Sequence, residues 1–412
     1  MSEQPSFPRT ARLGQTQEGF QRVLADPARL RRYTAATGRG TACDFFTGNP
    51  QELPLPGYVE ALRHAAVPQH PGWFAYGANQ PAARAVAAET LRARTGLPFA
   101  PEDIFLTAGG FGAIATALKA VTAPGDEALF CLPPWFFYEF LCVEAGLVPV
   151  KVPIDRRTFD LDLAAIEAAI TPRTRLVIVN TPNNPTGRIY PPALLRGLAA
   201  LLETASRRHG RPIYLLSDEV YNRIVFDGAA FCSPVEFYPH TLVAYSYGKT
   251  LLTPGDRAGY LALSPHAAPL PELRASALTA QSASAASWMN RLLQHALPDL
   301  EGLSIDIGAV ERRRDRLVGA LRGLGYAVHQ PEGTFWLLPR SPWADDWAFW
   351  GLLMEHDIFA LPGRAFEFPG YFRLSLTASD EMVERSLPGF AAAIAHARST
   401  TPAASAGMFA AV

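Results

Sequence analysis

The stretch from residue 213 to 263 decides the fold, through the apolar runs IYLLSD (213–218), LVAYSY (242–247) and GYLAL (259–263). Each run is apolar along its whole length, which is typical of strands that are buried on both faces of a sheet. An amphipathic helical pattern, ALLRGLAALLETASRRHG, precedes the first run and ends at Gly210. Strands of this kind that alternate with helices predict a mostly parallel α/β sheet covered on both faces.

The same alternation extends toward the N-terminus. Strand patterns occur at IFLT (104–107), EALFCL (127–132) and RLVIVN (175–180). Helical spacing of apolar residues between them predicts helices at 111–121 and 161–170. The large sheet is therefore expected to use most of residues 104–263.

The pattern changes toward both ends of the chain. The first ~40 residues are polar and rich in arginine, and they predict an arm instead of a core element. After residue 263, a smaller mixed sheet is expected from YAVHQ, GTFWLLP and YFRLSL, with helices near 270–296, 303–323, 345–356 and 380–397. We divide the chain into an arm (1–45), a large domain (46–300), a small C-terminal domain (301–398, with part of the N-terminal segment) and a flexible tail (399–412).

Composition excludes several classes of protein. Of the 412 residues, 49% are hydrophobic and 18% are charged, as in globular proteins, and the formal net charge is −1. No basic run indicates a nucleic-acid partner, no run of 18 apolar residues indicates a membrane span, and the N-terminus lacks a signal-peptide pattern. The four cysteines have no metal-type spacing, so we expect reduced thiols in a cytoplasmic enzyme without a metal.

Chemically useful side chains follow the predicted strands, where sites gather in parallel sheets. Asp218 ends an apolar strand, where a carboxylate needs a cationic partner, although an aspartate there also serves as a helix N-cap. Lys249 follows the neighbouring strand, and apolar walls make such an amine a usable nucleophile. Arg257, eight residues later, is available to a phosphate.

Three further strand ends carry weaker signals. Gly109 and Gly110 open a helix whose N-terminus suits a phosphate, but the pattern is not GxGxxG and does not support a dinucleotide site. PPWFFYEF (133–140) offers an aromatic face to a flat ring, or is simply core. NTPNNPTG (180–187) is a rigid polar turn, from which an asparagine can reach a cofactor oxygen.

In this order, NNPTG, SDEVY and YSYGKTLLTPGDRAGY resemble fold-type I pyridoxal 5'-phosphate (PLP) enzymes of the class I/II aminotransferase group, over residues 44–395. The resemblance implies a seven-stranded sheet in a large domain beside a smaller α+β domain. It implies PLP as cofactor and an L-α-amino acid and a 2-oxo acid as substrates of an aminotransferase. C–S lyases that work by β-elimination, ring-forming synthases and oxidative deaminases use the same scaffold and remain alternatives. A regulator with a degenerate site is disfavoured because Lys249, Asp218 and Arg373 are all present.

The resemblance also assigns roles around the cofactor ring. Lys249 forms the Schiff base and shuttles a proton, and Asp218 pairs with the ring nitrogen. Asn184 and Tyr221 bind the phenolic oxygen, and Trp135 stacks on the ring. The implied phosphate site consists of Gly109, Gly110, Phe111, Ser246 and Arg257.

Substrate and subunit contacts follow by the same resemblance. Arg373 grips the α-carboxylate through two parallel hydrogen bonds, with Gly48 and Asn184 beside it. Tyr76 reaches the phosphate of the other subunit, which implies a homodimer with shared active sites.

Two positions depart from the family pattern, and the amino donor stays open. Gly248 replaces a usual serine, so one phosphate-binding hydroxyl is missing. Arg364 replaces a small polar residue, and we expect a surface arginine in preference to an extra anion contact. The aromatic residues Trp73, Phe74, Tyr247 and Trp336 suggest a partly aromatic pocket, but core packing explains them equally well.

Overall fold

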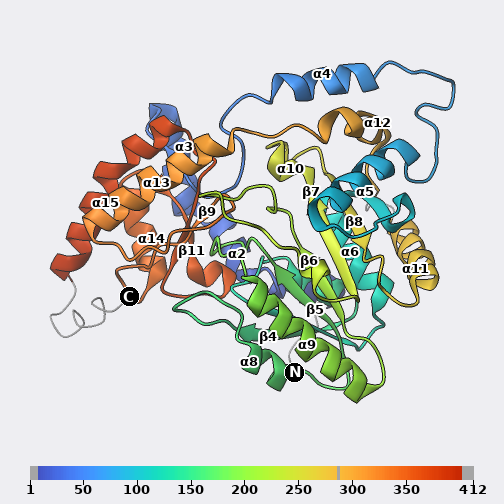
Figure 1. The fold of residues 1–412 in the computed structure, drawn as a ribbon. Helices are drawn as coiled ribbons and strands as arrows, with labels where there is room; N and C mark the ends of the chain where they lie inside the picture. The colour runs from blue at the N-terminus through green and yellow to red at the C-terminus, as the bar shows by residue number, and fades with distance from the viewer. Residues whose placement is uncertain (1–7, 285–287, 401–412) are drawn as a thin grey trace.

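A seven-stranded sheet forms the centre of the computed structural model, which describes residues 8–284 and 288–400 (Figure 1). Its order is β2-β8-β7-β6-β5-β3-β4, and β8 is antiparallel to both neighbours while the other neighbouring strands run parallel. The strands are β2 (Ile104–Ala108), β3 (Glu127–Leu132), β4 (Val148–Pro153), β5 (Thr174–Asn180), β6 (Tyr214–Asp218), β7 (Thr241–Ser246) and β8 (Ala258–Leu263). The predicted α/β class with a mostly parallel sheet is confirmed.

Helices cover both faces of this sheet because its strands are apolar on both sides. In β5, Leu176 and Ile178 belong to a core shared with α6, whereas Val177 and Val179 belong to a core shared with α9. The helices of the large sheet are α4 (Pro56–Ala65), α5 (Pro81–Thr95), α6 (Gly109–Val121), α7 (Tyr138–Glu144), α8 (Leu163–Ala169), α9 (Pro192–His209), α10 (Tyr247–Thr250), α11 (Leu270–Ala283) and α12 (Arg291–Leu300). Short 3-10 helices add η1 (Pro101–Asp103) and η2 (Pro234–Glu236).

The strand β4 was not predicted. Its sequence VPVKVP contains Pro149 and Pro153, which lack the N–H that a central strand must donate. β4 lies at the edge of the sheet, where a proline is tolerated.

A smaller antiparallel sheet of order β11-β12-β9 forms the second core (Figure 1). Its strands are β9 (Trp336–Leu337), β11 (Leu361–Pro362) and β12 (Phe372–Ser375). Three helices and a 3-10 helix accompany it: α13 (Ile307–Leu324), α14 (Asp346–Glu355), α15 (Asp380–Thr400) and η4 (Gly363–Phe366). The predicted strands around residues 336 and 373 are thus present but shorter than expected.

The N-terminal segment, which we predicted to be an arm and not a core element, is helical and contributes buried residues. It forms α1 (Pro8–Gln15), α2 (Glu18–Ala25) and α3 (Pro27–Arg39), followed by β1 (Cys43–Asp44), which pairs in parallel with β10 (Ile358–Phe359). Val23 and Ala36 are fully buried. Gly19 lets α2 approach the backbone of Ala365 in η4, since a Cβ would lie only 3.3 Å from it. The sparse apolar residues of α2 at 20, 23 and 24 follow helical spacing, but the surrounding charged residues obscure it in the sequence.

Three smaller expectations concern the tail, the membrane and the cysteines. Most of the predicted tail, from residue 401 on, lies outside the described residues, whereas residues 399 and 400 end α15. No helix in the described ranges has the length and apolarity needed to cross a bilayer. All four cysteines are free thiols, and Cys43 and Cys142 are buried.

Candidate active site

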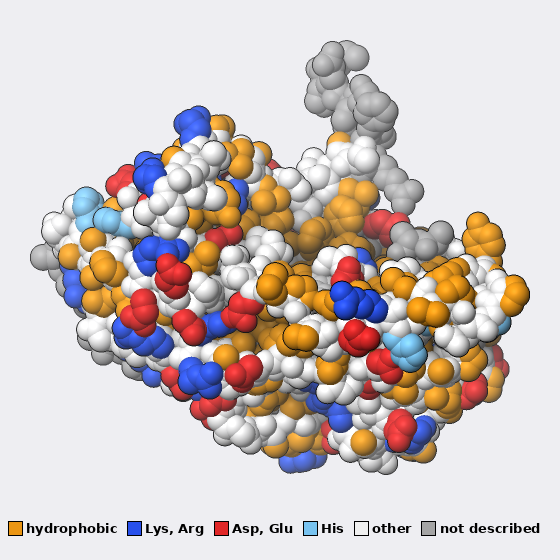
Figure 2. Space-filling model, turned by 90° about the horizontal axis from the view of Figure 1, so that it is seen from above, with side chains coloured by type: hydrophobic (Ala, Val, Ile, Leu, Met, Phe, Trp, Pro, Cys, Tyr) orange, Lys and Arg blue, Asp and Glu red, His pale blue; other side chains and the backbone are white. Residues whose placement is uncertain are grey.

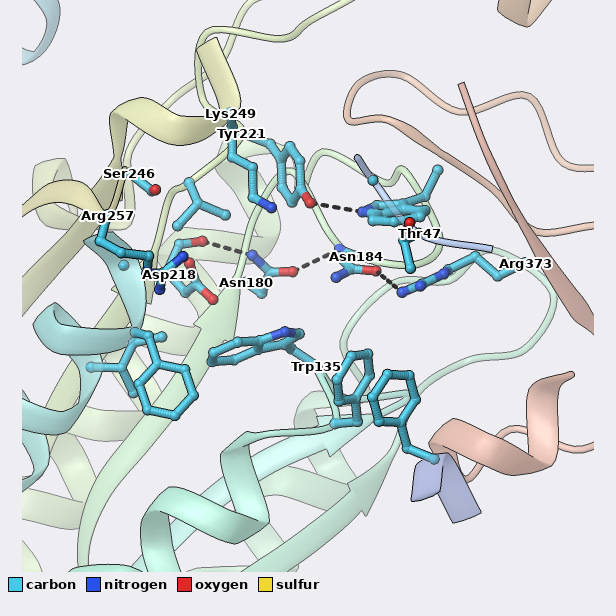
Figure 3. Close-up of a pocket in the computed structure, with 18 of the residues that line it drawn as sticks. Thr47, Trp135, Asn180, Asn184, Asp218, Tyr221, Ser246, Lys249, Arg257 and Arg373 are labelled. Atoms are coloured by element: carbon cyan, nitrogen blue, oxygen red, sulfur yellow. Dashed lines mark hydrogen bonds between the residues drawn. The ribbon is translucent and has the colours of Figure 1, made fainter. Parts of the chain in front are cut away.

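A pocket lies at the carboxyl ends of β5, β6 and β7, and residues of β9 and β12 close its other side (Figure 3). The residues that the sequence assigned to the site and that line this pocket are Gly48, Gly110, Phe111, Trp135, Asn184, Asp218, Tyr221, Ser246, Lys249, Arg257 and Arg373. Gly109 and Tyr76 are not among the lining residues.

Asp218 ends β6 as a deeply buried carboxylate. Its Oδ2 accepts a hydrogen bond from the Tyr138 hydroxyl, and its Oδ1 has no partner among the described residues. Burial raises the pKa of Asp218 to about 6, and the Tyr138 bond and the Lys249 charge only partly oppose this shift. A buried carboxylate with one free oxygen suits a ligand that brings a positively charged N–H.

A chain of hydrogen bonds runs from Asp218 to Arg373 across the pocket (Figure 3). Asn180, the last residue of β5, donates from Nδ2 to the Asp218 carbonyl at 2.9 Å. The Asn180 Oδ1 accepts a hydrogen bond from the backbone N–H of Asn184 at 2.6 Å. The side-chain Oδ1 of Asn184 in turn accepts one from Arg373 Nη1 at 3.2 Å. Sequence reasoning missed Asn180 and Tyr138. The signal for Asn180 was a polar residue at the end of an apolar strand, as at Asp218.

Lys249 lies in the short helix α10, directly after β7, and its side chain points into the pocket (Figure 3). Its Nζ is 5.5 Å from the centre of the Tyr221 ring. The Tyr221 hydroxyl accepts a hydrogen bond from Trp336 Nε1 at 2.8 Å, so its own proton remains available to a ligand. Gly248 precedes the lysine, and a Cβ there would meet the backbone of Pro254 at 3.1 Å. The missing serine is thus explained by the close approach of this loop.

The N-terminus of α6 faces Ser246 and Arg257 at the other end of the pocket. Gly109 has a φ of +68°, and an added Cβ would lie 3.3 Å from the Arg257 guanidinium. A Cβ on Gly110 would lie 2.7 Å from Val220. Both positions therefore require glycine. The free N–H groups of a helix N-terminus beside an arginine form a ready site for a phosphate.

Arg373 projects from β12 into the pocket as a buried cation. Its guanidinium lies over the Trp336 ring at 3.7 Å and donates to the Phe46 carbonyl at 3.3 Å, in addition to Asn184. Its Nε has no partner within the described chain. Burial lowers the pKa of Arg373 to about 10, which still leaves it charged at neutral pH. Gly48 leaves room for Trp336, whose ring would lie 3.2 Å from a Cβ.

Three phenylalanines form a wall of the pocket that sequence reasoning did not identify. Phe20 comes from α2, Phe46 follows β1, and Phe136 follows β3. The rings of Phe20 and Phe136 stack with centroids 4.2 Å apart, and those of Phe20 and Phe46 lie 6.2 Å apart. No local motif links residues from such distant segments, so the folded chain is needed to find this wall.

Of the four aromatic residues proposed for the pocket, only Trp336 lines it. Tyr247 is buried elsewhere and donates to Glu301, because the helix α10 turns its ring away from Lys249. Trp73 stacks on His295 at 3.6 Å, and Phe74 is half exposed on the surface.

Arg364 lies outside this pocket and is exposed. It forms an ion pair with Asp346 at 2.9 Å, and its amide donates to the same carboxylate. Its exposure agrees with the prediction of a surface arginine.

Known proteins match nearly the whole chain. The family described as aminotransferase class I and II matches residues 43–388. A probable aspartate/prephenate aminotransferase of Thermus aquaticus is 33% identical over 84% of this chain and 90% of its own length. The aspartate/prephenate aminotransferase of Thermus thermophilus is 32% identical over 85% of this chain and 91% of its own length.

Solved structures agree with these matches. An amino transferase from Eubacterium rectale superimposes with a TM-score of 0.85 at 28% identity, covering 92% of this chain and 98% of its own. A single mutant of the Thermus thermophilus aspartate aminotransferase superimposes with a TM-score of 0.79 at 30% identity. The match covers 90% of this chain and 98% of that chain.

Proposed function

This chain belongs to the class I and II aminotransferases, and from that premise we propose that Lys249 carries the cofactor and Arg373 holds the substrate. The protein is a PLP-dependent aminotransferase of fold type I, and its reaction moves an amino group between an amino acid and a 2-oxo acid. When bound, PLP supplies a ring that takes up the electron pair left as the substrate Cα–H bond breaks. The matched proteins are named aminotransferases, which favours this reaction over the other PLP chemistries.

One observation carries the assignment of roles: the pocket contains two buried charged side chains that each have an unused atom, Asp218 Oδ1 and Arg373 Nε. Burying either charge without a partner is costly. PLP with an amino acid brings a protonated ring nitrogen for the first and an α-carboxylate for the second. The residues present therefore fit the cofactor.

Around the ring, Asp218 would hold the nitrogen in its protonated state. The Tyr221 hydroxyl keeps its proton free and, with Asn184 Nδ2, would donate to the phenolic oxygen. Trp135 lies below these side chains, where its ring offers a face for stacking (Figure 3). Lys249 Nζ would bind the cofactor aldehyde, then take the proton from the substrate Cα once a substrate amine replaces it.

The phosphate would lie at the N-terminus of α6, between the Gly110 and Phe111 amides, Ser246 and Arg257. Gly109 permits the close approach of Arg257 because it has no Cβ. The substrate carboxylate would lie on Arg373 beside Gly48 and Asn184, where the guanidinium offers parallel N–H groups.

We also propose a homodimer in which Tyr76 completes the site of the other subunit. Tyr76 is fully exposed in the single chain, and Leu53, Val67 and Phe74 of the same region are also exposed. Hydrophobic side chains gather on the right-hand part of the surface in Figure 2, the side on which α4 and the chain after it lie in Figure 1. A patch of this kind typically marks an interface. A cytoplasmic location, in keeping with the four free thiols, stays a prediction.

Borohydride reduction followed by peptide mass spectrometry tests the central assignment. We expect the cofactor to be fixed on the peptide that contains Lys249, and Lys249→Ala to lose both the adduct and turnover by about 10⁴-fold or more. Wild-type turnover in Lys249→Ala, or an adduct on another lysine, would overturn it.

Mixing two inactive variants tests the dimer. Heterodimers of Tyr76→Ala and Lys249→Ala contain one site with both lesions and one intact site if Tyr76 acts across the interface. Partial activity should then return on mixing. If each subunit keeps its own lesion, mixing restores nothing and the shared site is refuted.

A further inference from the structure

We propose that this pocket selects amino acids with a single carboxylate and an apolar, preferably aromatic, side chain, and discriminates against dicarboxylic amino acids. The inference rests on the proposed function, because it takes the α-carboxylate to lie on Arg373. It concerns the remaining part of the pocket, where the substrate side chain must lie.

The cations of the pocket are already committed. Among the described residues, those that line it are Lys249, Arg257 and Arg373. The first carries the cofactor, the second faces the phosphate site, and the third takes the α-carboxylate. Among the described residues that line the pocket, no cation is left to pair with a second carboxylate of the substrate, and burying that carboxylate unpaired is strongly unfavourable.

Nearby cations are neutralised by carboxylates. In the adjoining pocket, Lys151 contacts Glu139 and Glu367, both at 2.8 Å. Arg364, in the same pocket, is paired with Asp346 at 2.9 Å. These side chains would have to break existing ion pairs to bind a substrate anion.

Arg29 is a further cation, among the described residues, that lies close to the aromatic wall. It covers the ring of Phe46 at 4.3 Å and is not among the lining residues. Burial lowers the pKa of Arg29, and the carboxylates of Asp44 and Asp26 oppose this shift because they stabilise its positive charge. The Phe46 ring thus contacts Arg29 and also lines the pocket, whereas Arg29 does not line it.

The free part of the pocket is aromatic. Phe20, Phe46 and Phe136 form a continuous wall of stacked rings. Phe111 adds an edge against Trp135, with centroids 5.5 Å apart. An apolar ring that contacts this wall in stacked or edge-to-face geometry makes binding more favourable.

The N-terminal helices fix this wall. Gln17 is almost fully buried, and its Nε2 donates to the Phe136 carbonyl at 2.6 Å. Gly19 brings α2 against Ala365 of η4. Phe20, between these two contacts, is thereby held in the pocket, so the N-terminal segment takes part in substrate selection.

The test measures the amino-donor half-reaction of the holoenzyme, followed by the absorbance of the cofactor without any acceptor. The donors are L-phenylalanine, L-leucine, L-aspartate and L-glutamate. We expect the second-order rate constant for phenylalanine to exceed that for aspartate by about 10²-fold or more, from the desolvation of an unpaired carboxylate. Aspartate or glutamate reacting within tenfold of phenylalanine would overturn the inference while leaving the aminotransferase intact. Failure of all four donors would instead count against the proposed function.

Two variants of the wall sharpen the test. Phe20→Lys supplies a cation and should raise the aspartate rate constant about tenfold while lowering that of phenylalanine. Gln21→Lys, exposed on the same helix, adds the same charge away from the pocket and should change neither. If Phe20→Lys does not fold, Phe20→Leu keeps an apolar wall without the ring. It should lower the ratio of phenylalanine to leucine and leave aspartate poor, and an unchanged ratio refutes a role for Phe20.

Discussion

The two sides of the pocket are built in different ways. On the cofactor side, Asn180, Asp218 and Ser246 end three neighbouring strands of one sheet, so their spacing follows from the pairing of β5, β6 and β7. On the substrate side, Phe20 and Arg373 come from opposite ends of the chain and meet only through tertiary packing. We infer that the proposed cofactor side is set by the strand pairing of one sheet, whereas the proposed substrate side depends on how α2 and β12 pack together. Mutations on one side should therefore affect cofactor chemistry, and mutations on the other side should affect substrate binding.

Among the substitutions that test this comparison, Asp218→Asn on the cofactor side should have the largest effect. The amide keeps the shape but removes the charge that stabilises a protonated ring nitrogen, so turnover with saturating PLP should fall at least ~10²-fold. The KM for the amino acid should change little, because Arg373 is untouched. Steady-state kinetics with the bound cofactor quantified provide the measurement, and activity within twofold of wild type would falsify the charge role of Asp218.

The same substitution should stabilise the protein when the cofactor is absent. The pKa of Asp218 rises from 3.8 to about 6 on folding, so between these values the folded state holds a proton that the unfolded state has released. Stability therefore falls as the pH rises through this window, by on the order of 3 kcal/mol above pH 6. Urea unfolding of the apo-proteins should show Asp218→Asn more stable than wild type at pH 8, with a smaller gap at pH 5. If the two proteins have the same free energy of unfolding, or if the difference between them narrows as the pH rises, the raised pKa of Asp218 is not the cause.

On the substrate side, Arg373→Lys should be somewhat milder. Lysine keeps the positive charge but loses the fork that binds a carboxylate through two N–H groups. We expect kcat/KM for amino acids to fall by ~1.5–3 kcal/mol, with the absorption spectrum of the bound PLP unchanged. A shifted spectrum would mean that the two sides are not separable, and an unaltered kcat/KM would remove Arg373 from the carboxylate site.

The smallest effect is expected from Tyr138→Phe, which acts on the cofactor through Asp218. The hydrogen bond from Tyr138 favours the charged carboxylate, so its loss should raise the pKa of Asp218 further. At neutral pH the activation free energy derived from kcat should rise by about 1 kcal/mol, and the acidic limb of the pH–rate profile should move to higher pH. A purely structural role for Tyr138 would lower stability without moving that limb.

The same division explains what the sequence could predict. Asp218 and Lys249 each follow an apolar strand within a few residues, so local patterns identified both the sheet and the side chains at its edge. Asn180 carried the same signal and was overlooked in favour of the turn that follows it. The strand β4 was hidden by prolines that only an edge position tolerates.

The substrate side was less predictable. Arg373 was found through resemblance to a family, whereas Phe20 and Phe46 lie in segments without a motif of their own. Helix α2, which carries Phe20, was predicted to be part of an arm because its apolar residues are few and lie among charges. Contacts between residues hundreds of positions apart depend on tertiary packing, and periodicity within a short window carries no information about them.

The unpaired oxygen of Asp218 also bears on the life of the protein in the cell. A polypeptide whose newly folded form holds an uncompensated buried charge gains stability when its vitamin-derived ligand arrives, by RT ln(1 + [L]/Kd). Chains made while that vitamin is scarce would spend more time unfolded and be removed sooner by proteases. The steady-state amount of the enzyme should therefore follow the vitamin B6 supply, even at a constant rate of synthesis.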